Sequence, residues 1–211
     1  MFTPPRRRAW RALCVSCFLV VGVGVSRGSD EPKALFDGKS LSGWTIENGG
    51  RFSVREGLLH LDRGTGWLRS DKTYADFTLI LEVRFNEARA NGGIFVRTGA
   101  TSHDDENGWP NNGYQVQCMD ATDVEHPLGT LIHYGASDFE QVYDAAKIEA
   151  LKEPAGKWNR LEITCRGEHL AVKLNGTLIT LAQGIAKRSG HVGLQGELGP
   201  LDFRTIELIE H

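Results

Sequence analysis

The chain has 211 residues and a formal net charge of −3, from 24 basic and 27 acidic side chains. Residues 1–28 hold five arginines and no acidic residue, so residues 29–211 carry 19 basic and 27 acidic side chains, a net charge of −8. Nucleic acids and anionic membranes are bound chiefly through Lys and Arg, so an acidic chain is a poor candidate for either partner. With 40% hydrophobic and 24% charged residues, the composition is typical of a globular protein.

Residues 1–28 have the three parts of a secretory signal peptide. Three arginines at 6–8 precede an apolar stretch at 12–25, and small residues surround a cleavage position at 26–28. The apolar stretch is shorter than the roughly 20 residues that cross a bilayer. We therefore expect a secreted or periplasmic protein, free of the membrane after cleavage, with one domain at 29–211. An uncleaved anchor and twin-arginine export are the alternatives.

Two of the four cysteines, Cys14 and Cys17, lie in the signal segment and form no redox motif there. The other two, Cys118 and Cys165, fall at inward positions of predicted strands. They are either small buried apolar residues or the two halves of a disulfide between strands.

Short β-branched and aromatic stretches separated by turns predict an all-β domain. The clearest strand is 76–85, where five apolar residues alternate with mostly polar ones. Further strands are predicted at 51–54, 58–62, 93–98, 114–119, 158–166, 170–174, 178–181, 191–195 and 201–209. Asn175-Gly176 predicts a type I′ hairpin turn, and 138–151 is the one predicted helix. About ten antiparallel strands favour a two-sheet β-sandwich of jelly-roll type.

Several common chemistries leave no motif in the sequence. Nucleophile elbows, zinc helices, phosphate loops and dinucleotide fingerprints are all missing. The acidic loop at 103–107 offers oxygens for Ca²⁺, but it lacks the regular spacing and the glycine of a calcium loop. We therefore predict no cofactor and no metal site, and we expect this loop to be solvated.

Two neighbouring strands carry the polar residues that indicate a ligand. Alternation directs Phe95 and Arg97 to the face opposite Ile94 and Val96, and it directs Gln115 and Gln117 outward together. If the two strands pair, the arginine and both amides form one polar patch beside an aromatic ring.

Amides, a guanidinium group and aromatic faces suit a sugar, since they bind vicinal hydroxyls and stack on C–H faces. Trp109 and Tyr134, with Trp67, lie near predicted loops and are candidates for the stacking. Asp120 ends the second strand, where a loop can turn its carboxylate toward the patch. The alternative is a hydrogen-bonded polar face that binds no ligand.

The sequence resembles the 3-keto-disaccharide hydrolase family over nearly the whole mature chain. The resemblance lies in LFDGKSLSGW (35–44), NGGIFVR (91–97), GYQVQ (113–117), PAGKWN (154–159), LNG (174–176), GHVGLQ (190–195) and FRTI (203–206).

The resemblance implies a concanavalin A-like jelly roll that binds sugar on its concave sheet and acts on glycosides oxidised at C3. The chain departs from the family at two points. It has Gln115 where the family commonly has glutamate, which puts hydrolysis in doubt if that glutamate is the acid or base. The stretch 121–129 is also longer than usual.

An ordinary glycosidase needs two carboxylates, but the corresponding strand positions here read Gln115, Gln117 and Asp120. A 3-keto sugar can instead lose its C1 substituent by elimination, because the ketone acidifies the C2 proton. We predict Asp120 or His133 as base or acid, with Arg97, Gln115 and Gln117 holding the substrate. A non-catalytic carbohydrate-binding module and an envelope interaction domain are the competing functions.

Overall fold

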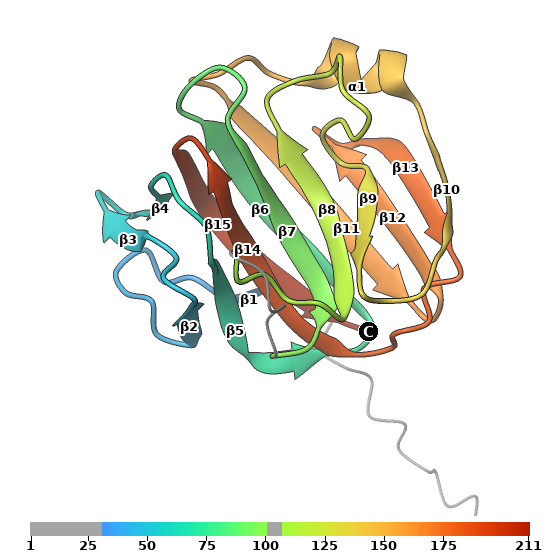
Figure 1. The fold of residues 1–211 in the computed structure, drawn as a ribbon, viewed down its shortest axis with the longest axis horizontal. Helices are drawn as coiled ribbons and strands as arrows, with labels where there is room; N and C mark the ends of the chain where they lie inside the picture. Colours follow the sequence, from blue (N-terminus) through green and yellow to red (C-terminus); the bar gives the residue numbers. More distant parts are fainter. Residues whose placement is uncertain (1–30, 101–106) are drawn as a thin grey trace, which may run out of the picture.

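The computed structural model describes residues 31–100 and 107–211 (Figure 1). The predicted signal peptide, residues 1–28, and all of the acidic loop except Asn107 lie outside the described residues. Within the described ranges, no helix has the length and apolar character needed to span a bilayer.

Two antiparallel sheets pack face to face, with one short helix, α1 (Ala145–Leu151), at one end (Figure 1). The nine-stranded sheet runs β10 (Glu140–Tyr143), β13 (Thr177–Gln183), β12 (His169–Leu174), β11 (Trp158–Arg166), β6 (Phe77–Phe85), β15 (Leu201–Glu210), β4 (Leu58–Leu61) and β3 (Phe52–Arg55), with β1 (Lys33–Ala34) beside β15. The six-stranded sheet runs β2 (Trp44–Glu47), β5 (Trp67–Tyr74), β14 (Gly190–Leu198), β7 (Asn91–Thr98), β8 (Gly113–Met119) and β9 (Leu131–Tyr134). The predicted all-β sandwich is confirmed.

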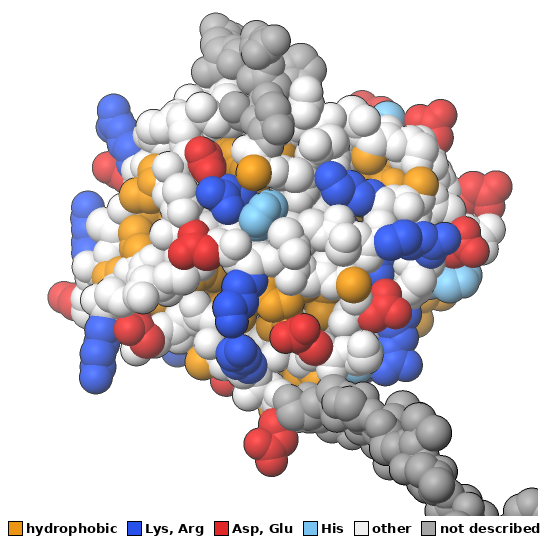
Figure 2. All heavy atoms as spheres, turned by 90° about the horizontal axis from the view of Figure 1, so that it is seen from below, with side chains coloured by type: hydrophobic (Ala, Val, Ile, Leu, Met, Phe, Trp, Pro, Cys, Tyr) orange, Lys and Arg blue, Asp and Glu red, His pale blue; other side chains and the backbone are white. Residues whose placement is uncertain are grey.

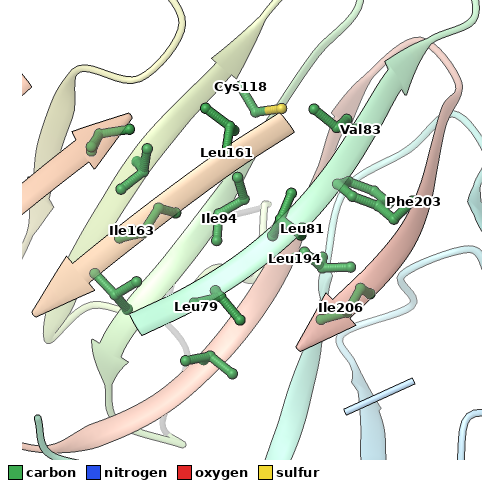
Figure 3. Close-up of a cluster of buried hydrophobic side chains, with 14 of the residues drawn as sticks. Leu79, Leu81, Val83, Ile94, Cys118, Leu161, Ile163, Leu194, Phe203 and Ile206 are labelled. Carbon is green, nitrogen blue, oxygen red and sulfur yellow. The ribbon is translucent and has the colours of Figure 1, made fainter. Parts of the chain in front are cut away.

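The core fills the space between the sheets with the alternate residues of their central strands. Figure 3 shows side chains from β6, β11 and β15 meeting side chains from β7, β8 and β14. Burial of each such aliphatic side chain contributes about 1.5–3 kcal/mol. The labelled residues are Leu79, Leu81, Val83, Leu161, Ile163, Phe203 and Ile206 from one sheet, and Ile94, Cys118 and Leu194 from the other.

Cys118 and Cys165 are both buried in this core and both free, which rejects the disulfide. Desolvation raises the pKa of the Cys118 thiol and raises the pKa of Cys165 to about 12. Both sulfurs therefore act as small apolar groups rather than as nucleophiles.

The predicted hairpin is confirmed, because Asn175 (φ 48°) and Gly176 (φ 84°) join β12 to β13. The helix predicted at 138–151 is only half correct. Its first part is strand β10, which pairs along β13, and the helix starts after Asp144, whose carboxylate accepts a hydrogen bond from Lys147 N at 2.9 Å. A β-pairing partner distant in sequence decided the conformation of Glu140–Tyr143.

Strands β1, β2, β5 and β9 were not predicted. The largest of them, β5, lacks regular alternation because a bulge interrupts its pairing with β14. Arg69 pairs with Gly193 and Thr73 with His191. An interval of four residues on β5 therefore lies opposite an interval of two residues on β14. Three consecutive exposed residues, 71–73, follow from this irregularity.

Arg97 does not point to the outer face, and its predicted place in the polar patch is wrong. It has φ 50° and lies in a bulge, since Phe95 pairs with Gly193 but Thr98 with His191. The bulge breaks the alternation, and the side chain enters one end of the sandwich, where it is fully buried. Its guanidinium donates to Ala75 O at 2.8 Å, Gly167 O at 2.6 Å and Asp76 Oδ1 at 2.8 Å.

We therefore expect Arg97→Ala to lower the free energy of unfolding by about 3–5 kcal/mol, because it removes a fully buried guanidinium and leaves Ala75 O and Gly167 O without their donor. Urea denaturation followed by circular dichroism measures this loss. The matched control is Arg166→Ala, an exposed arginine at the end of β11, which should change stability by about 0.5 kcal/mol or less. Equal stability of the two variants would contradict this structural role for Arg97.

Candidate functional site

The three central strands of the six-stranded sheet place amide side chains beside one another on the face opposite the core. Gly93 on β7 lies directly opposite Gln117 on β8 and Gln195 on β14. Gln195 in turn pairs with Trp67 on β5. The row Gln117, Gly93, Gln195 and Trp67 therefore crosses four strands on one face.

Two glycines on this face, Gly93 and Gly193, let a neighbouring side chain lie against the sheet. A Cβ atom at Gly93 would come within 2.3 Å of Gln115 Nε2. A Cβ atom at Gly193 would come within 2.6 Å of the Trp67 ring. Side chains at either position would displace the amide or the indole.

Gln115 and Gln117 point outward together, as predicted, and they bind each other. Gln115 Nε2 donates to Gln117 Oε1 at 2.9 Å, and the same oxygen accepts from Cys118 N at 3.1 Å. Both side chains are buried. Their amides are therefore held in one orientation rather than left to rotate.

We call Asn91, Gln115, Gln117 and Gln195 the amide cluster, because alternation along their strands places all four on this outer face. Several buried polar atoms here have no hydrogen-bond partner within the protein: Asn91 Oδ1, Gln115 Oε1, both amide atoms of Gln195, and Trp67 Nε1. Elsewhere in the described ranges only Arg84 Nε and Thr180 Oγ1 share this state. Buried polar groups are normally paired with protein groups or with ordered water, so this concentration makes the outer face of the six-stranded sheet the candidate site.

Aromatic rings border the amide cluster in a continuous chain. Trp67 contacts Phe95 with ring centroids 5.5 Å apart, Phe95 contacts Tyr134 at 5.8 Å, and Tyr134 contacts Trp109 at 5.9 Å. All three contacts are edge-to-face, the favourable geometry for aromatic pairs. The structure thus brings Phe95, Tyr134 and Trp109 together, as the sequence predicted.

Residues 107–112 hold Trp109 in this position. Gly66 N donates to Asn107 O at 2.9 Å and Asn48 Nδ2 donates to Gly108 O at 2.7 Å. The Trp109 indole donates to Gly196 O at 3.0 Å. Bonds to separate elements therefore tie this segment across the edge of the site.

The structure brings neither of the two predicted acid–base side chains into the amide cluster. Asp120 forms an ion pair with Lys152 and accepts a hydrogen bond from Arg89 N at 3.2 Å. His133 is exposed and pairs with Tyr114, whose ring is in the core. It therefore projects from the opposite face of β9 to the glutamines.

Glu197 is a carboxylate near the amide cluster that the sequence reading missed. A β-bulge between Gly196 and Leu198 sets both Glu197 and Leu198 against Asn91. Desolvation by burial raises the pKa of the Glu197 carboxyl, and an interaction with the Asn91 amide partly opposes this shift. A second carboxylate, Glu47 on β2, accepts from Arg69 Nε at 2.7 Å.

Cavities also occur on other parts of the described surface. One of about 540 Å³ is on the outer face of the nine-stranded sheet, beside Leu181 and Val142. Its lining is mainly apolar and holds none of the unpartnered buried amides. We place the candidate site on the six-stranded sheet because unsatisfied polar groups, unlike an apolar hollow, specify ligand chemistry.

The family model for the 3-keto-alpha-glucoside-1,2-lyase-like domain matches residues 31–209. This chain belongs to that family. No curated protein sequence matches it. Within this lyase-like domain, Gln115 belongs to the amide cluster, with its amide beside Gly93. In the described ranges, no group of three or more His, Cys, Asp or Glu side chains is placed to hold a metal ion.

Solved structures share the fold of this lyase-like domain. A "Putative glycosyl hydrolase" from Parabacteroides distasonis is 21% identical, with a TM-score of 0.64 over 86% of this chain and 100% of that one. Carbohydrate-binding module CBM66 from Bacillus subtilis is 19% identical, with a TM-score of 0.58 over 80% and 96%. At these identities the likeness establishes the fold alone.

Some residues of the site that we did not predict have a signal in the sequence of this lyase-like domain, and others do not. Val192 and Leu194 are apolar and inward, so alternation already directed Gln195 outward. The bulge that turns Glu197 toward Asn91 leaves no such pattern. Trp67 was predicted near a loop, because the strand that positions it was not recognised.

Two substitutions in the amide cluster should change stability in opposite directions. Gln195→Met removes two unpartnered buried atoms and should raise the free energy of unfolding by about 1 kcal/mol. Gln117→Met removes the acceptor for Cys118 N and Gln115 Nε2 and should lower it by about 1–3 kcal/mol. Chemical denaturation of the two variants beside the wild type measures both changes.

Both substitutions should weaken sugar binding by at least tenfold, measured by calorimetry. The control is Gln183→Met, an exposed glutamine on β13 of the other sheet, which should change neither quantity. A stability loss in Gln195→Met would contradict the assignment of its amide to a ligand.

Proposed function

We propose that this domain binds 3-keto-glycosides on the outer face of the six-stranded sheet and cleaves them by elimination followed by hydration. The observation that supports this most is the amide cluster, in which buried donors and acceptors remain unpartnered beside aromatic rings. Amides and aromatic faces match a neutral polyol, because they pair with hydroxyls and pack against C–H faces. The chemistry named by the family agrees with this proposal.

The surface charge fits a neutral ligand. The face in Figure 2 intersperses Lys and Arg with Asp and Glu, and its described part has no broad patch of one sign. Beside the amide cluster, Arg69 is paired with Glu47. Recognition by hydrogen bonds and stacking therefore suits this site better than recognition of a polyanion.

Elimination requires fewer catalytic groups from the protein than direct glycoside hydrolysis. A ketone at C3 acidifies the C2 proton, so one base can remove it while the C1–O bond breaks. Charge then develops on the ketone oxygen, where a fixed donor stabilises the enolate. The unpartnered Nε2 of Gln195 is a suitable donor, because its amide is held against the sheet without a competing partner.

A non-catalytic carbohydrate-binding module is the second candidate function. The observation that favours it is the hydrogen-bonded pair Gln115 and Gln117, which cannot titrate. A module of this kind would bind unoxidised sugars as well. A third candidate, an envelope interaction domain, would bind neither. We further propose that the protein is secreted or periplasmic, as its N-terminal segment suggests.

We expect the purified domain to release reducing sugar from 3-keto-trehalose or 3-keto-lactose, and not from trehalose or lactose. Only the keto forms have an acidified C2 proton. Chromatography of the products and calorimetry on the same sugars provide the two measurements. Saturable binding of unoxidised sugars without turnover would favour the binding module instead.

Sugar binding should also change the fluorescence of Trp109, because its indole is hydrogen-bonded to Gly196 O, next to Gln195. Trp109→Phe should remove at least half of the ligand-induced change in tryptophan emission. The control is Trp158→Phe on the other sheet, where the indole stacks under Arg204 at 4.2 Å. A full response in Trp109→Phe would place the ligand elsewhere.

A further inference from the structure

We propose that Glu197 is the general acid–base of this site and that one carboxylate serves both the elimination and the hydration. This inference rests on the proposed function. Glu197 follows Gln195 by two residues on β14, so their backbones are about 7 Å apart. In a 3-keto sugar the C2 proton and the C3 oxygen are on adjacent carbons, and a base and an oxyanion donor at this spacing can address both.

The local fold turns Glu197 toward the ligand side. The bulge at Gly196–Leu198 sets it against Asn91, a member of the amide cluster. The carboxylate is partly buried, and Asn91 Oδ1 next to it has no partner in the protein. A group in this setting is desolvated yet still reachable by a substrate.

Desolvation also tunes the carboxyl for acid–base work. It raises the pKa of Glu197 above the ordinary glutamate value of 4.5. A carboxyl with a raised pKa is a stronger base when ionised and remains a proton donor at higher pH. The same shift means that the ionised form is disfavoured by folding, so the neutral Gln at this position should not destabilise the domain.

The charged groups around Glu197 are already paired with one another. Glu87, whose carboxylate adjoins Gly199, pairs with Arg63. Beyond the start of β7, Arg89 pairs with Asp123. Lys152 pairs with Asp120 in the same region. Among residues 31–100 and 107–211, these pairs leave Glu197 as the titratable group set against the amide cluster at this end.

The proposed reaction balances without any co-reactant except water. The Glu197 carboxylate takes the C2 proton, and the C–H electron pair forms the enolate and then the C1–C2 double bond. The C1–O bond breaks, and its oxygen takes the proton from Glu197. Water then adds its oxygen to C1 and gives one proton to Glu197, which returns it to C2.

The decisive experiment compares the wild type with Glu197→Gln, Glu197→Asp and the control Glu168→Gln, an exposed glutamate in the β11–β12 turn. The first measurement is kcat/KM against pH on a 3-keto-disaccharide. The second is deuterium exchange at C2 of a 3-keto sugar with hydrogen in place of the C1 oxygen, which tests proton removal without a leaving group. Circular dichroism and sugar binding report the fold.

We expect Glu197→Gln to lose at least 100-fold in kcat/KM and in C2 exchange, with binding retained, in the range typical of lost acid–base catalysis. Wild-type activity should rise with pH through the raised pKa of Glu197, because the base must be ionised, and this limb should be absent in Glu197→Gln. Glu197→Asp should recover part of the activity with a shifted limb. Glu168→Gln should match the wild type.

A Glu197→Gln rate within threefold of an active wild type, with the same pH limb, would overturn the role of Glu197 and leave the proposed function standing. A wild type that neither cleaves nor exchanges any 3-keto sugar would overturn both. If Glu197→Gln failed to fold, the Glu197→Asp profile would decide, since an unshifted limb there would overturn the proposal.

Discussion

The register of β7 between β14 and β8 is the constraint on which the site depends. Gly93 lies opposite both Gln117 and Gln195, while Ile94 beside it points into the core. A slip of one residue would exchange the two faces, burying amides among aliphatic side chains. The same pairing that builds the hydrophobic core therefore also gathers the amide cluster.

Glycine at two positions on this face extends the effect of the register. The missing side chains of Gly93 and Gly193 leave room for the Gln115 amide and the Trp67 indole to lie against the backbone. Polar atoms are thereby held close to the sheet, and the chain of aromatic contacts from Trp67 to Trp109 borders them. The site is a layer of buried polar groups bordered by aromatic rings.

Period-two alternation was enough to predict much of this arrangement. The core face of β6, the outward pair Gln115 and Gln117, and the hairpin at Asn175 followed from it directly. It failed where the pairing is irregular. Bulges turn Arg97 inward, place Glu197 against Asn91 and break the alternation along β5. A bulge depends on the partner strand rather than on the local sequence, so alternation does not predict it.

Long-range contacts explain the remaining differences. Strand β10 forms because it pairs with the edge of β13. The sequence of Glu140–Tyr143 alone does not indicate this pairing. Asp120 was expected at the site because it ends β8, but Lys152, which follows α1, binds its carboxylate instead. Which carboxylate is available for chemistry was therefore decided by neighbours more than 30 residues away.

The unpartnered amides also lower the stability of the folded protein, and this cost is informative. Leaving one buried donor or acceptor without a hydrogen bond costs about 1–3 kcal/mol, against a total stability of about 5–15 kcal/mol for a typical domain. Gln195 alone leaves two such atoms. A leucine or methionine would fill the same space without this cost, so packing gives no reason for an amide there. A ligand that supplies the missing partners does give one, because the hydrogen bonds that the folded protein lacks then form when the ligand binds.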